Sequence, residues 1–406
     1  MKKVMLFALT LLLGWSCQKN QEQLIPANPV PEAVAIDHQV TLNEAIEHAS
    51  RILFGEETTR SRGREIKNTE LFVARPATRS TEGEEISFYL INYEGGGFAM
   101  ASTDSRTTPI YAYSDKGQLN ASDFSENPGL SVYLAEAVIP LFESELENPV
   151  AQPASWTDRK PIPTNPILLL ATEERDGIIY YVDCEEFNPR YGPYLVTEWH
   201  QGDPYNRLLA PDLVGYSPLA AGQIMAYHKH PASYGDVNFD WEAMTASPTF
   251  PNEDVSQATY DISWLVWNIG EEAGTNHGTT NSSTNFNRID DGFEAFGYTT
   301  SDPTYPDRDR MIGRLADGYP IWMRGVNSSG IGHAWVVDGY HCRFFINYFY
   351  SSTPPYNLCF TESITHPTYY HCNWGWGGSG NGFYVYPELG EYTSGLRCIH
   401  DIVPNR

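Results

Sequence analysis

The sequence predicts an α+β protein in which a small N-terminal α+β domain precedes a larger second domain. A helix pattern after residue 38 and several short apolar runs up to residue 113 predict the first domain. Beyond residue 170 the composition shifts towards aromatic residues, glycine and asparagine, which marks the second. A chain of 406 residues is also too long for one ordinary core, so we expect two domains of about 150 to 200 residues each.

The first helix is predicted by its start signal and by its apolar face. Thr41 followed three residues later by Glu44 is a capping box, in which each side chain bonds the other residue's backbone N–H. The apolar residues that recur at helical spacing are Leu42, Ala45, Ile46, Ala49, Ile52 and Leu53. Gly55 ends the pattern, so an amphipathic helix is expected between Thr41 and Gly55.

Strands and a second helix follow this helix. A basic loop is expected at 60–64, and the segments predicted as strands are 71–74, 86–92, 98–102 and 110–113. The glycine-rich stretch 93–97 between two of them suits a hairpin turn, because glycine adopts the positive φ that such turns need. Residues 130–146 predict a helix interrupted at Pro140, which has no N–H to donate.

We divide the chain by composition into an N-terminal domain at 38–150, a proline-bearing linker at 151–170 and a second domain at 171–406. Ahead of them, residues 1–17 have the layout of a bacterial lipoprotein signal, in which Lys2 and Lys3 precede an apolar run that ends shortly before Cys17. Residues 18–37 then form a polar tether from lipidated Cys17. An ordinary secretory signal is the alternative, because Gly14 and Trp15 depart from the usual lipobox. The expected location is extracytoplasmic, either lipid-anchored in the cell envelope or secreted.

Charge and composition exclude several classes of function. The 51 acidic and 26 basic residues give a net charge of −25, which repels nucleic acid and anionic headgroups, so membrane contact is expected only through the lipid anchor. Aromatic residues make up 13% and charged residues 19%, which is not the composition of a disordered chain. Besides Cys17 there are five cysteines, so at least one is unpaired, and no CxxC spacing indicates zinc.

Four motifs in the second domain carry the chemistry. They are WHQGDPYN at 199–206, GYSPLAAGQIMAYH at 215–228, GHAWVVDG at 332–339 and NWGWGG at 373–378. In order and wording they resemble the streptopain family of secreted bacterial cysteine peptidases, strongly over about 190–390 and more loosely, as its propeptide, over 70–115. The resemblance implies a papain-like catalytic domain behind an inhibitory propeptide, and no cofactor.

The resemblance also implies the roles of individual residues. His333 is the counterpart of the histidine that deprotonates the nucleophile and later protonates the leaving amine. Asn373 corresponds to the residue that orients this imidazole, and Trp374 to the one that keeps water from their hydrogen bond. Gln201 is the candidate oxyanion donor. The neighbouring residues expected to bind substrate are Gly215, Gly332 and Trp335.

The nucleophile itself is missing. The family's Gly-Cys pair places the cysteine seven residues before the glutamine of Gln-Ile-Met, here Gln223, and that position holds Tyr216 after a retained Gly215. A phenol has an ordinary pKa near 10, against about 8.5 for a thiol, and its ring cannot place oxygen where sulfur would be. We therefore expect Tyr216 to fill the cleft without attacking a substrate.

Ser217, Cys372, His228 and His230 are the other candidates for a nucleophile or a metal ligand. Ser217 could act as a nucleophile, but Ser followed by Pro218 also suits an N-cap with proline at the first helical position. Cys372 is expected to be buried and inert, because neighbours on a strand point to opposite faces and Asn373 takes the other one. His228 and His230 close a predicted helix without an acidic or thiolate partner, so no metal site is expected.

Three functional hypotheses follow. The first is a catalytically silent streptopain-like protein, expected to be a monomer, that binds a peptide or protein in its degenerate cleft or whose N-terminal domain inhibits a protease. The second is an active peptidase that uses Ser217 or another thiol. The third is a surface glycan-binding lipoprotein, suggested by the aromatic content. His333 fits either of the first two, because it is retained for chemistry in one and for packing in the other.

Overall fold

The structure, a computed structural model, describes residues 38–54, 64–74, 86–147, 171–175, 178–352, 358–365, 367–386 and 395–405. The predicted signal with Cys17, the tether, the linker at 151–170 and nearly all of the basic loop at 60–64 lie outside the described residues. Residues 38–406 form one compact unit. None of the helices in the described ranges combines the length and apolar character needed to span a membrane.

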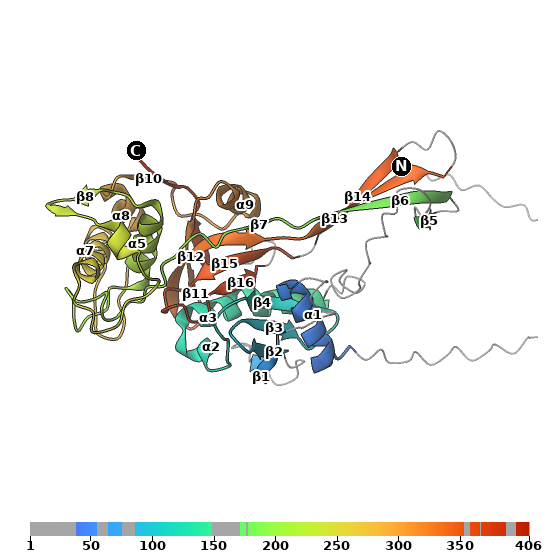
Figure 1. The fold of residues 1–406 in the computed structure, drawn as a ribbon, viewed down its shortest axis with the longest axis horizontal. Coiled ribbons are helices and arrows are strands. Elements are labelled where there is room, and N and C mark those ends of the chain that lie inside the picture. The colour runs from blue at the N-terminus through green and yellow to red at the C-terminus, as the bar shows by residue number, and fades with distance from the viewer. Residues whose placement is uncertain are drawn as a thin grey trace, which may run out of the picture. The chain divides into compact units, whose positions relative to one another are not determined.

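The N-terminal part is the predicted small α+β arrangement (Figure 1). Its elements are α1 Leu42–Phe54, β1 Ile66–Ala74, β2 Ile86–Tyr93, β3 Phe98–Ser102, β4 Ile110–Ser114, α2 Asp123–Glu126, α3 Pro128–Tyr133, the π-helical turn η1 Leu134–Val138 and α4 Ile139–Glu147. The capping box is confirmed, because the Thr41 N–H donates to Glu44 Oε2 at 2.8 Å and the Glu44 N–H to Thr41 Oγ1 at 3.4 Å. The hairpin is confirmed as well, with positive φ at Gly95, Gly96 and Gly97.

The single helix predicted at 130–146 is divided into three pieces, and the disturbance lies one turn before Pro140. In η1 the backbone N–H of Ile139 donates to the carbonyl of Leu134, five residues back. Proline lacks an N–H and its ring clashes with the carbonyl four residues earlier. The wider turn moves those carbonyls, so the strain at Pro140 is relieved upstream.

The second part combines a sheet with a helical half. Its helices are α5 Tyr216–His228, α6 Trp241–Met244, α7 Gln257–Glu272, the 3-10 turn η2 Phe286–Arg288, α8 Ile289–Ala295 and α9 Arg308–Ala316. Its strands are β5 Ala171–Arg175, β6 Ile178–Phe187, β7 Arg190–Tyr191, β8 Ser233–Tyr234, β9 Val237–Asn238, β10 Tyr298–Thr300, β11 Ile321–Val326, β12 Gly332–His341, β13 Phe344–Ser351, β14 Leu358–Thr365, β15 Tyr369–Asn373, β16 Gly382–Val385, β17 Leu396–Ile399 and β18 Ile402–Pro404.

One ten-stranded sheet runs through both parts. Its order is β1-β2-β3-β4-β16-β15-β12-β11-β17, with β7 added to β12, and a separate sheet has the order β14-β13-β6-β5. The join is the antiparallel pair β4 and β16, where Tyr113 faces Phe383 and Ala112 faces Tyr384 (Figure 1). The two predicted domains therefore share backbone hydrogen bonds, which a sequence division at 151–170 does not reveal.

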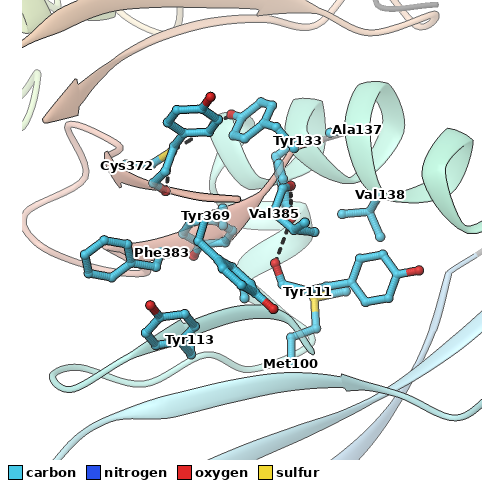
Figure 2. Packing of buried hydrophobic residues seen from close by; sticks show 14 of the residues in the cluster. Met100, Tyr111, Tyr113, Tyr133, Ala137, Val138, Tyr369, Cys372, Phe383 and Val385 are labelled. Atoms are coloured by element: carbon cyan, nitrogen blue, oxygen red, sulfur yellow. Dashed lines mark hydrogen bonds between the residues drawn. The ribbon is translucent and has the colours of Figure 1, made fainter. Parts of the chain in front are cut away.

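A shared aromatic core backs this join (Figure 2). The Tyr133 hydroxyl lies within hydrogen-bond distance of the carbonyls of Tyr111, at 3.0 Å, and Val385, at 2.9 Å. The rings of Tyr113 and Phe383 stack with centroids 5.2 Å apart. The contacts of Tyr133 with Val385 and of Tyr113 with Phe383 link the N-terminal part to the second, so the core of one continues into the other.

The helical half has its own core on the opposite face of β11 and β12. Trp322 on β11 and Val336 on β12 pack with buried residues of α5, α7 and α8. Their strand neighbours Met323 and Trp335 belong to the shared aromatic core. This alternation follows from the two-residue period of a strand, and it places β12, which begins at Gly332, between the two cores.

Candidate functional site

The site lies where helix α5 meets strand β12. Gly215 is the N-cap of α5, with φ 89° and ψ 146°, a conformation that favours glycine. Tyr216 is the first helical residue, so Ser217 lies inside the helix and the prediction that it is the N-cap is wrong. Glycine could take that place because its backbone turns the chain into the helix without a side-chain cap. Pro218 is still tolerated, since first-turn N–H groups have no intrahelical partner.

The ring of Tyr216 fills the space between two aromatic side chains. Its centroid is 4.0 Å from that of the His333 imidazole and 5.8 Å from that of the stacked Trp376 indole. Burial raises the pKa of the Tyr216 phenol well above its usual value of 10, although a hydrogen bond with the side chain of Gln201 opposes the shift. The phenol is therefore neutral at pH 7 and is a poor nucleophile.

His333 is 4% exposed and is held as a neutral imidazole. Burial lowers its pKa to about 4, and the hydrogen bond with the Trp374 carbonyl only partly offsets this. Nε2 lies 2.8 Å from that carbonyl oxygen, so Nε2 carries the proton and donates it. Nδ1 is therefore the unprotonated nitrogen, and it has no hydrogen-bond partner among the described residues.

Asn373 and Trp374 adjoin His333 but differ from their expected roles. The Asn373 amide donates to the Thr197 carbonyl at 2.7 Å, and its oxygen accepts from the Gly375 N–H at 3.1 Å. The imidazole N–H instead donates to the backbone carbonyl of Trp374. The indole of Trp374 is fully buried, with its ring centroid 6.4 Å from that of His333, and its N–H donates to the Gly380 carbonyl at 3.0 Å.

Three further residues were predicted at the site, namely Gln201, Gly332 and Trp335. Gln201 lies beside Tyr216, where its Oε1 has no partner among the described residues, so its amide bonds the phenol in place of an oxyanion. Gly332 is exposed at the start of β12. Trp335 was expected to bind substrate, but it has no exposed surface and belongs to the shared aromatic core. In this structure the Trp335 ring stacks on the His333 imidazole and cannot contact a ligand.

Helix α3 of the N-terminal part covers His333, a contact that the sequence reasoning missed. A Cβ atom added to Gly129 would lie 2.6 Å from Cδ2 of His333 and 2.6 Å from Cε3 of Trp374. The absence of a side chain at Gly129 is what lets the helix approach this closely. The residues at the start of α3 are a signal that the sequence contains. Asn127 caps the helix by accepting from the Gly129 N–H at 2.9 Å, and Pro128 is at its first position.

A second polar contact joins the two parts on β12. The Tyr113 hydroxyl of β4 bonds Nδ1 of His341, whose Nε2 lies 2.6 Å from the Asn188 amide oxygen. Nε2 must donate to that oxygen, so Nδ1 accepts from the phenol and the ring is neutral. Burial, reinforced by the charges of Arg190 and Arg343, lowers the pKa of His341 to about 4.

One hollow remains open beside Tyr216 with α3 in place. It has a volume of about 200 Å³ and lies between the start of α5, the loop at 281–284 and the facing ends of β11 and β12. Its lining includes Tyr216, Ser217, Arg324 and His333. The sequence motifs did not include Arg324, which lies on β11, eight residues before Gly332. A ligand of the size of one amino-acid residue could enter this space.

The other candidate residues lie away from the site. Cys372 is fully buried, and its thiol lies 3.9 Å from the Tyr386 hydroxyl; burial raises its pKa well above the usual value, as it does for Cys398. His230 lies two residues beyond the end of α5 at His228, with Nε2 3.1 Å from the Gly297 carbonyl. Within the described ranges, no group of three or more His, Cys, Asp or Glu side chains is arranged to hold a metal ion.

Comparison with known families matches both parts of the chain. Residues 199–384 match the model of the peptidase C10 family, and residues 37–138 match that of the Spi protease inhibitor. Tyr216, His333, Gln201, Arg324, Asn373 and Trp374 fall in the first range, and Gly129 falls in the second.

Individual relatives agree with these matches. The chain is 24% identical to streptopain from Streptococcus pyogenes over 369 residues, covering 77% of this chain and 78% of streptopain. It is 26% identical to the thiol protease/hemagglutinin PrtT from Porphyromonas gingivalis, covering 76% of this chain and 35% of that protein. The solved structure of a fragment of Prevotella intermedia prointerpain A has the same fold, with a TM-score of 0.52 and 17% identity over 82% of this chain and 98% of that fragment. The chain therefore belongs to the peptidase C10, or streptopain, family, with a propeptide-like inhibitor domain ahead of a papain-like peptidase domain.

Proposed function

We propose that this chain is a catalytically silent member of its family, which binds a peptide or protein without cleaving it. The observation that carries the proposal is the Tyr216 ring, packed against His333 at the position where the family has its cysteine. Removing one member of a nucleophilic triad costs about 10⁴ to 10⁶-fold in rate in well-studied hydrolases. A neutral phenol with a raised pKa does not recover that loss.

The environment of His333 supports the same proposal. A general base works best when its pKa lies near the working pH, whereas burial lowers the pKa of His333 to about 4. Its Nδ1 could accept a proton, but no thiol of the described residues bonds it, and Cys372 is enclosed in the shared aromatic core. His333 and Trp374 instead provide the surface on which α3 packs.

The join between β4 and β16 supports a second element of the proposal, that the propeptide-like domain stays attached. A member without a nucleophile cannot process itself, and separation would break the β4–β16 hydrogen bonds and the contact of the Tyr133 hydroxyl with the Val385 carbonyl. The chain then acts as one unit, and the hollow beside Tyr216 offers space for a ligand. We expect it to be a monomer outside the cytoplasm, held by lipid on Cys17.

Hydrolysis and thiol labelling test the catalytic proposal together. The wild-type chain should leave casein and a fluorogenic peptide library uncut, and should not react with an epoxysuccinyl peptide, an inhibitor that alkylates active-site cysteines. Tyr216→Cys should gain stoichiometric labelling at residue 216, in a Cys359→Ser background because Cys359 is exposed. Ser217→Ala is the matched control for the alternative nucleophile. Hydrolysis by the wild type that is lost in Ser217→Ala or His333→Ala would refute the proposal.

Mass spectrometry of protein from the native host tests the other two elements. An intact chain, starting at Cys17 with added acyl mass, is the expected result. A fragment cut within 151–170 would show that the N-terminal domain is released, and a Cys17→Ser variant that remains in the membrane fraction would exclude the lipid anchor. Thiol chemistry at Cys17 is separate from the cleft, so each result can be read independently.

A further inference from the structure

The hollow beside Tyr216 differs in charge from the rest of the chain. The whole sequence has 51 acidic and 26 basic residues, yet the residues that line this space include no aspartate or glutamate. Their only formally charged member is Arg324, among serine, threonine, asparagine and glycine residues. The lining of the hollow therefore carries positive charge, whereas the net charge of the whole chain is negative.

A second arginine lies directly beside the first. Arg324 on β11 is the register partner of Arg397 on β17, so both side chains point to the same face of the sheet. Arg324 is half-buried, and its pKa is lowered by burial and then by the charge of Arg397. The Arg397 guanidinium lies 3.7 Å from the centroid of the Tyr305 ring. Two arginines at paired positions concentrate positive charge beside the hollow, which favours an anionic ligand.

The opposite wall of the hollow is a braced loop. Asn276 and Ser283 exchange backbone hydrogen bonds of 2.8 and 3.0 Å, and Thr275 and Thr284 bond through their hydroxyls at 2.9 Å. The Ser282 hydroxyl donates to the Leu213 carbonyl at 2.7 Å. The loop is held before any ligand arrives, which lowers the entropic cost of binding.

The side chain of His333 also lines the hollow, and its buried Nδ1 has no hydrogen-bond partner among the described residues. The hollow has a volume of about 200 Å³, which is below the roughly 300 to 1,000 Å³ of pockets for drug-sized ligands and suits one amino-acid residue.

We propose that this hollow binds a peptide carboxylate, with the Arg324 guanidinium as its ion-pairing partner and the loop at 281–284 as the opposite wall. The inference rests on the proposed peptide-binding function and names its ligand class. A carboxylate can come from a chain terminus or from an Asp or Glu side chain, and the geometry of guanidinium suits both.

Binding of four acetylated tetrapeptides to the full chain tests this inference. The probes are tetraalanine with a free C-terminus, tetraalanine amide, and amides carrying aspartate or asparagine at the third position. By calorimetry in 50 mM NaCl, a probe with a carboxylate should bind at least about tenfold more tightly than its neutral counterpart. The terminal pair and the side-chain pair identify the source of the carboxylate. The preference should shrink in 500 mM NaCl.

Variants of Arg324 complete the test. Arg324→Gln should abolish the preference for a carboxylate, Arg324→Lys should keep part of it, and Arg51→Gln on α1 should leave it unchanged. Should Arg324→Gln not fold, the lysine variant and the salt dependence of the wild type decide.

Peptides that bind with no preference for a carboxylate would overturn this inference and leave peptide binding intact. Failure of all four probes to bind would overturn both. Cleavage of a probe would refute the silent-enzyme proposal alone, because the carboxylate preference could still be read from relative rates.

Discussion

The two faces of the sheet at strands β11 and β12 have different surroundings. On one face, His333 and Trp335 are sealed beneath α3, whose Gly129 leaves no room for a side chain. On the other, Arg324 and Ala334 border a polar hollow that α3 does not close. Side chains alternate between the faces of a strand, so adjacent residues of β12 belong to different environments. His333, the residue that would act in a peptidase, packs under α3 on one face and also lines the edge of the hollow, whereas Arg324 lies on the open face.

Enlarging Gly129 should break the sealed face most strongly. Gly129→Leu would place a side chain where even a Cβ lies 2.6 Å from His333 and Trp374. We expect a loss of about 2 to 3 kcal/mol in the free energy of unfolding, with faster hydrogen exchange in α3. Gly313→Ala in α9 is the control, because nothing lies within 4 Å of its added Cβ. Equal effects from the two variants would show that α3 is not packed on His333.

The second-largest effect should come from acid, which lowers the free energy of unfolding through His333 and His341. The pKa values of His333 and His341 are lowered to about 4 in the folded chain, against an ordinary 6.5, so the unfolded chain binds more protons between these values. Stability is thus fully present above about pH 6.5 and falls as pH decreases towards 4, by about 1 to 3 kcal/mol. Urea unfolding across this range measures it. His341→Gln should flatten the dependence, and an unchanged slope would contradict the assignment.

A smaller loss is expected from the Tyr133 hydroxyl. Tyr133→Phe leaves the ring in the shared aromatic core but removes the donor near the carbonyls of Tyr111 and Val385. The expected cost is about 1 to 2 kcal/mol, measured by denaturant unfolding. Tyr89→Phe provides the comparison, since its hydroxyl contacts the Val40 carbonyl at 3.2 Å within the N-terminal part only. A loss no greater than in that control would remove Tyr133 as a link between the parts.

The open face should tolerate substitution. The Ser283 side chain is exposed on the loop at 281–284, and its backbone makes the bonds to Asn276. Ser283→Ala should therefore change the free energy of unfolding by less than about 0.5 kcal/mol. A thermal melt is sufficient, and a large drop would mean that this wall carries the fold.

Local signals predicted the elements whose causes are local. The capping box of Thr41 and Glu44 and the glycines at 95–97 act within a few residues, and both features are present. The start of α5 was misplaced by two residues, because Ser217 and Pro218 imitate a cap while Gly215 supplies one through its backbone. The π-helical turn before Pro140 also depends on packing that the sequence of that helix does not contain.

Long-range contacts account for the other differences. The motifs predicted that Tyr216, His333, Gln201 and Trp374 lie close together, as the resemblance implied, and they do. No motif indicated that Asn373 would bond Thr197, or that Trp335 would be sealed under α3. Those outcomes depend on which surface covers β12, and the covering residues lie about 200 positions earlier in the chain. Arg324 was missed because a single arginine in a strand has no local pattern.

The continuous sheet also protects the chain from self-association. In the joined state β16 is flanked by β15 and β4, and its backbone groups on both sides are paired. Release of the N-terminal part would turn β16 into an edge strand with Phe383 and Tyr384 beside it. Exposed edges of this kind recruit strands from other molecules. If the chain is catalytically silent, as we propose, release would bring no proteolytic activity, and remaining joined avoids this aggregation hazard.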